Sequence, residues 1–341
     1  MEWPGREVAS VRALLARMHD ADPGELHLEH RPLRGGLEAA SVTRLAVRYR
    51  DPEGKPRVHT MVVKRVAGSA IREAGVYRSL LSTAPAVAPR LLAAEHLGPG
   101  RAVLYLEALR PASRWPWREV AAAGAVLERA AFLHRWKPSR DAAADLSVWD
   151  YEAELMVSAE RTLERLERLG SRATPVFRRG MRWARRLVGA LPAVRRQLLA
   201  YGPFGVSPIH GDLHSGNVIL CRRGGRVEPV LLDWARARIG SPLEDVSSWL
   251  QSLGGWEPEA RRRHDTLLKV YLAARGMDGR LGTDLREAYW LAGASNALAG
   301  ALSYHLWVMG HERSSPSRVA HASSSAREWV RILRRADACW S

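Results

Sequence analysis

The sequence predicts an α+β fold in two parts, a strand-rich part at residues 1–109 followed by a mostly helical part at residues 110–341. In the first part apolar residues alternate with polar ones, as they do in half-buried strands. In the second part they recur every three or four positions, as they do in amphipathic helices. The pattern changes between Leu109 and Pro116, where we place the boundary between two domains.

A β-hairpin is predicted within residues 31–66. The stretch RPLRGGLEAASVTRLAVRYR places Gly35 and Gly36 between apolar runs and then alternates apolar and charged residues. After the turn DPEGKP comes RVHTMVVKRV, whose valines favour a strand. This strand carries Lys64, which on these grounds alone could be an ordinary edge-strand lysine.

A helix is predicted at residues 70–83, where apolar residues recur at helical spacing up to the breaker APAVAP. Glu73 lies near the start of this helix. Two further strand candidates, RLLAAEHL and AVLYLEAL, lie on either side of GPG. The predicted order in the first part is therefore strand, strand, helix, strand, strand.

From about Trp117 onward the sequence predicts mainly helices. They include REVAAAGAVLERAAFLHRW, DYEAELMVSAERTLERLERLG and VFRRGMRWARRLVGALPAVRRQLLAY. Short strands are expected around IHGDLHSGN and VEPVLLDWARARIG, and helices return beyond Pro242.

The composition narrows the possible partners and location. Fifty-two basic and thirty-six acidic residues give a net charge of +16, which favours phosphates, acidic peptides or other anions. Codon bias toward arginine is a competing explanation. No helix-turn-helix, zinc finger or aromatic β-platform is evident, so nucleic acid is an unlikely partner. Two cysteines without paired spacing, and no apolar run of about 20 residues, predict a cytoplasmic protein without a membrane segment.

The stretch IHGDLHSGN concentrates polar residues that two kinds of chemistry could use. His210, Asp212 and His214 alternate, so on a strand they would share one face and could bind zinc as in a metallohydrolase. Asp233 could then supply a further ligand. This hypothesis leaves Asn217 and the strand-rich first part without a role.

Phosphoryl transfer uses more of the chain. It requires a lysine on the nucleotide phosphates, a carboxylate for the acceptor hydroxyl and ligands for magnesium. The sequence offers Lys64, Asp212, Asn217 and Asp233 in that order. The five-residue spacing of Asp212 and Asn217 is that of the base and the metal-binding asparagine in a kinase catalytic loop.

The linked motifs HGDLHSGNVIL and VLLDWARARIGSPLEDVSSWL resemble those of the aminoglycoside phosphotransferase family, which are small-molecule kinases related in fold to protein kinases. The resemblance covers roughly residues 30–310 and is strongest at 208–250. It implies a protein-kinase-like two-lobed fold, with a β-rich nucleotide-binding N-lobe and a helical C-lobe for catalysis and substrate. It also implies ATP and Mg²⁺ as cofactors.

By position, the resemblance makes Asp212 the catalytic carboxylate that faces the acceptor hydroxyl. Asn217 and Asp233 would hold the magnesium ions, and His210 matches a structural loop histidine of the family. Without the resemblance, Asp233 could be a turn residue at a strand end. Asp245 matches a buried aspartate of the family, but we interpret it mainly as a helix cap.

The resemblance also implies nucleotide contacts in the first part. Lys64 would contact the α- and β-phosphates and pair with Glu73. The backbone around Gly35 and Gly36 would cover the phosphates, although these glycines alone would indicate only a hairpin turn. The segment YLEAL would be the hinge that hydrogen-bonds adenine, through residues near Glu107 and Leu109.

We expect the acceptor to be a hydroxyl-bearing small molecule or a serine or threonine of an acidic peptide. Residues 168–211 contain nine arginines and no Asp or Glu, so this region could bind an anionic partner or could simply be a solvated helix face. A polycationic aminoglycoside would be repelled by such a surface. A non-catalytic kinase-like binding module is a further alternative.

Overall fold

The computed structural model of the chain describes residues 3–20, 22–33, 39–84, 87–113, 115–147, 150–169, 174–254, 257–311 and 314–340. The chain divides into two compact units. Unit 1 comprises Met1–Pro111 together with Leu232–Arg236, and unit 2 comprises Ala112–Leu231 and Ala237–Ser341. The single domain boundary expected near residue 109 stays a prediction.

Unit 1 is built on a five-stranded antiparallel sheet with the strand order β1-β2-β3-β5-β4. The strands are β1 (His27–Pro32), β2 (Ala39–Arg50), β3 (Pro56–Ala67), β4 (Leu91–His96) and β5 (Arg101–Glu107). β2 and β3 form the predicted hairpin, and Lys64 on β3 lies opposite Val42 of β2 and Leu104 of β5. Lys64 is therefore on a strand with neighbours on both sides.

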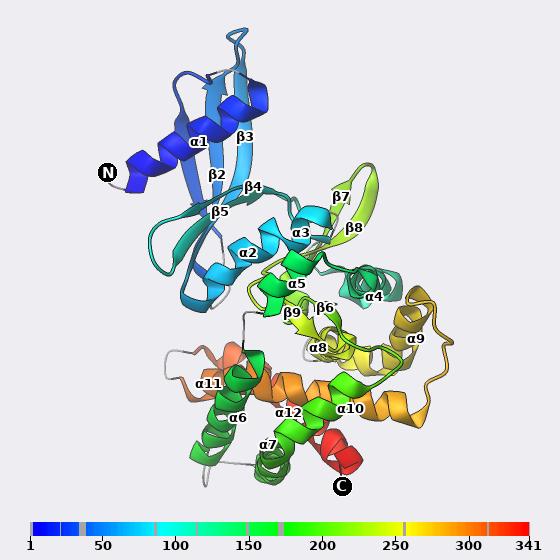
Figure 1. Cartoon of the computed structure of the whole chain (residues 1–341). Coiled ribbons are helices and arrows are strands. Elements are labelled where there is room, and N and C mark those ends of the chain that lie inside the picture. The colour runs from blue at the N-terminus through cyan, green and yellow to red at the C-terminus, as the bar shows by residue number, and fades with distance from the viewer. Residues whose placement is uncertain are drawn as a thin grey trace. The chain divides into compact units, whose positions relative to one another are not determined.

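Helix α1 (Trp3–His19) crosses one face of this sheet (Figure 1). Its residues Val11, Leu14 and Leu15 are buried against strand residues that include Leu45 and Met61. The sequence analysis does not include this helix, although the spacing of its apolar residues is helical. The helix predicted at residues 70–83 is present as η1 (Gly68–Ile71), α2 (Arg72–Arg78) and α3 (Leu80–Thr83).

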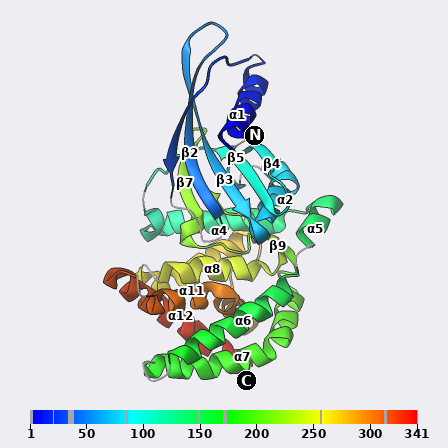
Figure 2. The same ribbon diagram turned by 90° about the vertical axis from the view of Figure 1, so that its left-hand side faces the viewer.

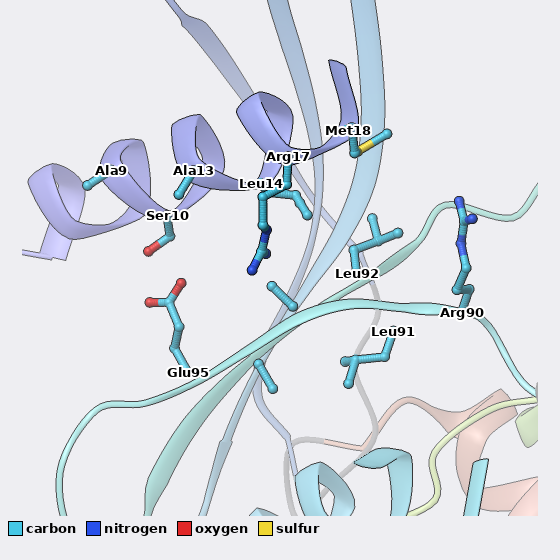
Figure 3. A pocket seen from close by; sticks show the side chains of 12 residues that line it. Ala9, Ser10, Ala13, Leu14, Arg17, Met18, Arg90, Leu91, Leu92 and Glu95 are labelled. Atoms are coloured by element: carbon cyan, nitrogen blue, oxygen red, sulfur yellow. The ribbon is translucent and has the colours of Figure 1, made fainter. Parts of the chain in front are cut away.

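A groove lies between α1 and the edge strand β4 (Figure 3). Leu14, Leu91 and Leu92 line it, and Ser10 and Glu95 face one another at one end of the close-up. None of the residues predicted to contact the nucleotide lines this groove. It is therefore a separate feature of unit 1.

Unit 2 is mainly helical. Its helices are η3 (Pro116–Arg118), α4 (Val120–Arg135), α5 (Arg140–Ser147), α6 (Tyr151–Arg168), α7 (Pro175–Ala200), η5 (Ser215–Asn217), α8 (Pro242–Gly254), η6 (Pro258–Arg263), α9 (His264–Ala274), α10 (Thr283–Asn296), the π-helical η7 (Ala297–Ala301), α11 (Leu302–Gly310) and α12 (Pro316–Trp340). Two short sheets pair β6 (Ser207–Ile209) with β9 (Arg238–Gly240), and β7 (Val218–Arg223) with β8 (Arg226–Leu231). Of the helices in the described ranges, none combines the length and the apolar character needed to cross a bilayer.

A large apolar cluster of unit 2 lies among α6, α7, α10 and α12. Figure 2 shows α6 and α7 running side by side, and buried leucines such as Leu155 and Leu187 pack between the helices. α7 also packs on α12, where Gly180 faces Val330. A Cβ on Gly180 would lie 2.8 Å from Val330 Cγ1, so this contact has no room for a side chain.

We expect Gly180→Ala to lower the free energy of unfolding by about 1–3 kcal/mol, because the added methyl overpacks the contact with Val330. Gly189→Ala is the matched control, since Gly189 is in the same helix and a Cβ there would meet nothing within 4 Å. The control should raise stability by about 0.5–1 kcal/mol through helix propensity. Urea unfolding measures both changes, and equal effects would contradict close packing of α7 on α12.

Candidate active site

Lys64 is buried in unit 1, with 8% of its side chain exposed. Its Nζ atom is 2.6 Å from Glu73 Oε2 and 2.9 Å from Asp233 Oδ1. Val63 points into the core beneath α1, so the alternation of the strand directs Lys64 to the opposite face. Strand β3, helix α2 and the segment 232–236 thus each contribute one charge to a buried cluster.

Backbone contacts attach the segment 232–236 to α2. The Trp234 N–H donates to Glu73 Oε1 at 3.1 Å, and the Arg72 guanidinium donates to the Ala235 carbonyl at 3.0 Å. Ala235 also packs in a small apolar cluster with Val66. These contacts fix Asp233 beside Lys64, although 169 positions separate the two in sequence.

Burial opposes the charge of the Lys64 ammonium, but the carboxylates of Glu73 and Asp233 outweigh it, so the pKa of Lys64 is raised. Burial raises the pKa of Glu73, and the negative charge of Asp233 adds to this rise against the effect of Lys64. Lys64 therefore stays protonated at neutral pH and can present a positive charge to a phosphate.

Asp233 has left-handed backbone geometry, with φ of 62°. Among the described non-glycine residues only Asp20 shares a positive φ. This region disfavours side chains by about 1–2 kcal/mol, and Asp and Asn tolerate it better than most residues. Such strain clusters at functional sites, which makes Asp233 a functional candidate on backbone grounds as well.

Asp212 and Asn217 lie in the loop that joins β6 to β7 in unit 2. The Asn217 Nδ2 group donates to the Asp212 carbonyl at 3.0 Å and to Asp212 Oδ2 at 3.2 Å. The Asp212 side chain is 42% exposed, so solvent or a substrate can reach it. Asn217 thus orients a carboxylate that is accessible to solvent.

Asp245, at the start of α8, anchors this loop. It is 1% exposed and accepts the N–H of His210 at 2.7 Å and of Gly211 at 2.8 Å. Its Oδ2 also lies 3.1 Å from His134 Nε2, while His134 Nδ1 contacts the Tyr271 hydroxyl at 2.8 Å. The cap interpretation assigned Asp245 only to the start of a helix. The structure shows that it also binds two backbone N–H groups of the loop. No signal in one sequence links Asp245 or His134 to the loop, because both contacts are long-range.

Burial lowers the pKa of His134, so its ring is neutral and can donate Nε2–H to Asp245. Burial alone would raise the pKa of Asp245, but the hydrogen bond from His134 and the N–H of His210 hold it below its usual value. The anchor is thus an ionised carboxylate beside a neutral imidazole.

The histidine cluster proposed for zinc is not assembled. His210 is fully buried, and its Nδ1 accepts the Asp212 N–H at 3.3 Å. His214 Nδ1 accepts the Gly216 N–H, and its Nε2 lies 3.7 Å from Asp212 Oδ2. In the described part of the chain, no group of three or more His, Cys, Asp or Glu side chains could hold a metal ion. The geometry gives the metallohydrolase hypothesis no support.

Comparison with known proteins bears on the same residues. The model of the Phosphotransferase enzyme family matches residues 57–288, which is more than half of the chain. The chain belongs to the phosphotransferase enzyme family. The predicted enzyme class is confirmed. No curated protein matches the chain.

Solved kinase structures resemble this phosphotransferase in fold. A choline kinase from Cryptosporidium parvum is 11% identical with a TM-score of 0.59, covering 96% of this chain and 95% of that one. An ethanolamine kinase from Plasmodium vivax is 12% identical with a TM-score of 0.58, covering 90% and 83%. An aminoglycoside phosphotransferase from Streptomyces rimosus, in complex with ADP and streptomycin, is 19% identical with a TM-score of 0.50, covering 85% and 98%. The predicted kinase-like α+β fold is confirmed.

The donor atoms expected to hold magnesium suit that ion. Asp233 Oδ2 and Asn217 Oδ1 make no hydrogen bond to the described residues, and both are hard oxygen donors of the kind Mg²⁺ prefers. One ammonium and two carboxylates also leave the Lys64 cluster with a net negative charge, which favours a cation. The chemistry of these donors therefore fits the predicted ion.

Other expected nucleotide contacts are less defined. Gly35 and Gly36 lie outside the described residues. The Glu107 side chain accepts the Arg90 N–H at 3.1 Å, and its own N–H donates to the Arg90 carbonyl at 2.9 Å. Glu107 thus joins β5 to the residue before β4, and Leu109 is partly exposed. Their hinge role stays a prediction.

Many arginines of the 168–211 region are paired within unit 2. The pairs are Arg168 with Glu164, Arg185 with Glu167, Arg186 with Asp337, and Arg195 with Glu152 and Glu244. Arg178, Arg179, Arg182 and Arg196 are exposed on α7 and form no ion pair with described residues. The cationic surface is smaller than the arginine count indicates.

We expect Asp245→Asn to lower the free energy of unfolding by about 1–3 kcal/mol at pH 7, because one buried N–H of the loop loses its acceptor. Since the pKa of Asp245 is lowered in the folded state, its contribution is present above the unfolded value near 3.8 and is lost as pH falls through the folded value. The difference from wild type should therefore shrink below about pH 4.

Urea unfolding at pH 7, 5 and 3.5 measures this difference. The exposed Asp278→Asn is the control, because among the described residues Asp278 pairs with Arg280 alone, at the surface, and the change should leave stability nearly unchanged. A pH-independent difference for Asp245→Asn would contradict an ionised anchor.

Proposed function

We propose that the protein is an ATP- and magnesium-dependent kinase that transfers the γ-phosphoryl group to a hydroxyl of a small molecule. The observation that carries the proposal is the buried Lys64, held between Glu73 and Asp233 at 2.6 and 2.9 Å. A protonated lysine beside two carboxylates can exchange its ion pair with one carboxylate for an ion pair with a phosphate oxygen. Family membership supports the same chemistry.

The residues of unit 1, together with Asn217 of unit 2, would act on the nucleotide and its metal ion. Lys64 would bind the α- and β-phosphates, and Glu73 would keep its ammonium in place when Asp233 turns to a metal ion. Asp233 and Asn217 would hold Mg²⁺, which when bound neutralises charge on the phosphates. The adenine contacts near Glu107 and Leu109 and the backbone cover around Gly35 and Gly36 remain part of this proposal.

The residues of unit 2 would act on the acceptor. Asp212, oriented by Asn217, would accept the proton of the acceptor hydroxyl as its oxygen forms a bond to the γ-phosphorus. The bond from that phosphorus to the oxygen of the β-phosphate breaks, and ADP leaves. The phosphorylated acceptor is the other product.

The acceptor class follows from two observations. The similar structures are named as kinases of choline and ethanolamine and as an aminoglycoside phosphotransferase, which supports a small acceptor over a serine or threonine of an acidic peptide. The exposed Arg178, Arg179, Arg182 and Arg196 on α7 support an acceptor or partner with negative charge.

We expect saturating Mg²⁺ and ATP, at about a hundred times the dissociation constant, to stabilise the protein by about 2.7 kcal/mol. Asp233→Asn should lose most of this gain, because asparagine keeps the left-handed backbone but is a poorer magnesium ligand. Thermal unfolding with and without nucleotide measures the shift. Asp22→Asn, an exposed change in the same unit, should keep the full shift. An unshifted wild type would contradict nucleotide binding.

We expect Asp212→Asn to reduce phosphoryl transfer by about 10²–10⁴-fold, because the acceptor proton loses its base. Its thermal shift with Mg²⁺ and ATP should remain, since Asp212 is assigned to the acceptor. Transfer of radiolabelled γ-phosphate to hydroxyl compounds of differing charge, and to water, measures the loss. Wild-type rates in this variant would exclude Asp212 as the base.

A further inference from the structure

Both backbone polar groups of Gly211, the residue immediately before Asp212, are hydrogen-bonded to side chains. Its N–H donates to Asp245 Oδ1 at 2.8 Å, and its carbonyl accepts from Arg238 Nη1 at 3.2 Å. Gly211 has φ of 79°, a left-handed conformation that glycine adopts readily because it has no Cβ. The Asp245 bond thus fixes the peptide group that enters Gly211, and the Arg238 bond fixes the peptide group that leads to Asp212.

Arg238 itself is rigidly placed. It lies on β9 with 3% of its side chain exposed, and its Nη2 is 3.0 Å from Glu244 Oε1. Its guanidinium lies over the ring of Tyr151, 3.6 Å from the centroid. Gly240 leaves space for this pairing, because a Cβ there would lie 2.9 Å from Glu244 Oε2.

A second arginine shares the same carboxylate. Arg195 Nη1 lies 2.6 Å from Glu244 Oε1, and its Nε donates to Glu152 at 3.0 Å. Burial opposes ionisation of Glu244, but the charges of Arg195 and Arg238 outweigh it and lower its pKa. Glu244 thus remains a counter-ion for Arg195 if Arg238 is replaced, so a variant at Arg238 can retain the rest of the network.

We propose that Arg238 is a positioning residue for phosphoryl transfer, which holds the Gly211 carbonyl so that Asp212 faces the acceptor hydroxyl. The inference rests on the proposed function, because it assigns Asp212 as the base. It does not make Arg238 a contact of nucleotide or acceptor. Loss of Arg238 should therefore slow transfer without weakening nucleotide binding.

A double-mutant cycle tests this coupling. Arg238→Met should lower kcat for transfer from ATP, to water or to an identified acceptor, by at least tenfold, with nucleotide affinity within twofold of wild type. In the Asp212→Asn background the same change should cause no further loss, because the residue through which Arg238 acts is already absent. Arg238→Lys keeps one charged donor and should fall between wild type and Arg238→Met.

Arg165→Met is the matched control, since Arg165 also donates to a backbone carbonyl, that of Ser303 at 2.8 Å, but on α11. It should leave kcat unchanged. An equal loss in both variants, a fall in nucleotide affinity, or a full additional loss in the Asp212→Asn background would overturn the positioning role. If Asp212→Asn itself leaves transfer unchanged, the proposed function fails instead.

Hydrogen exchange gives a readout that needs no activity. Amides of residues 209–217 should exchange at least tenfold faster in Arg238→Met than in wild type, while Arg165→Met leaves them unchanged. Unchanged exchange in Arg238→Met would show that the loop does not depend on Arg238, and would overturn the inference even in a protein with no measurable turnover.

Discussion

A lysine ammonium buried in unit 1 must have counter-charges, because an unpaired buried charge costs several kcal/mol. Lys64 meets this requirement with one carboxylate from α2 and one from the segment 232–236. That segment is preceded and followed in the chain by unit 2, yet its contacts place it in unit 1. The counter-charge that Lys64 requires is therefore one reason why this segment belongs to unit 1, together with the packing of Ala235 against Val66.

Unit 2 also contains buried charges that need partners, namely two adjacent acidic residues at the start of α8. Asp245 is surrounded by N–H donors and a neutral imidazole, whereas Glu244 is surrounded by guanidinium groups. Asp245 stabilises the loop by accepting its backbone N–H groups. Glu244 stabilises it through Arg238, which donates to the Gly211 carbonyl. The two residues at the start of α8 therefore fix, directly or through Arg238, the two peptide groups on either side of Gly211.

The sequence was informative where the physics is local. Alternation along RVHTMVVKRV and helical spacing after it predict β3 and α2, and the motif resemblance brings Lys64 and Glu73 together as the structure does. Helix α1 was missed because residues 1–109 were interpreted as strand-rich, although the apolar residues of Trp3–His19 have helical spacing. The contact between Arg238 and Glu244 could not be predicted from the sequence. Nothing in the neighbouring residues distinguishes this buried arginine from the many arginines at the surface.

The backbone at Asp233 limits how this site can change over time. A left-handed conformation is readily adopted by glycine and next by asparagine and aspartate, and most other residues would strain the segment that carries Trp234 and Ala235. Homologous proteins that keep this fold should therefore have glycine, asparagine or aspartate at this position. Under the proposed function, a relative with asparagine or glycine at this position would keep the backbone conformation and lose the carboxylate assigned to magnesium.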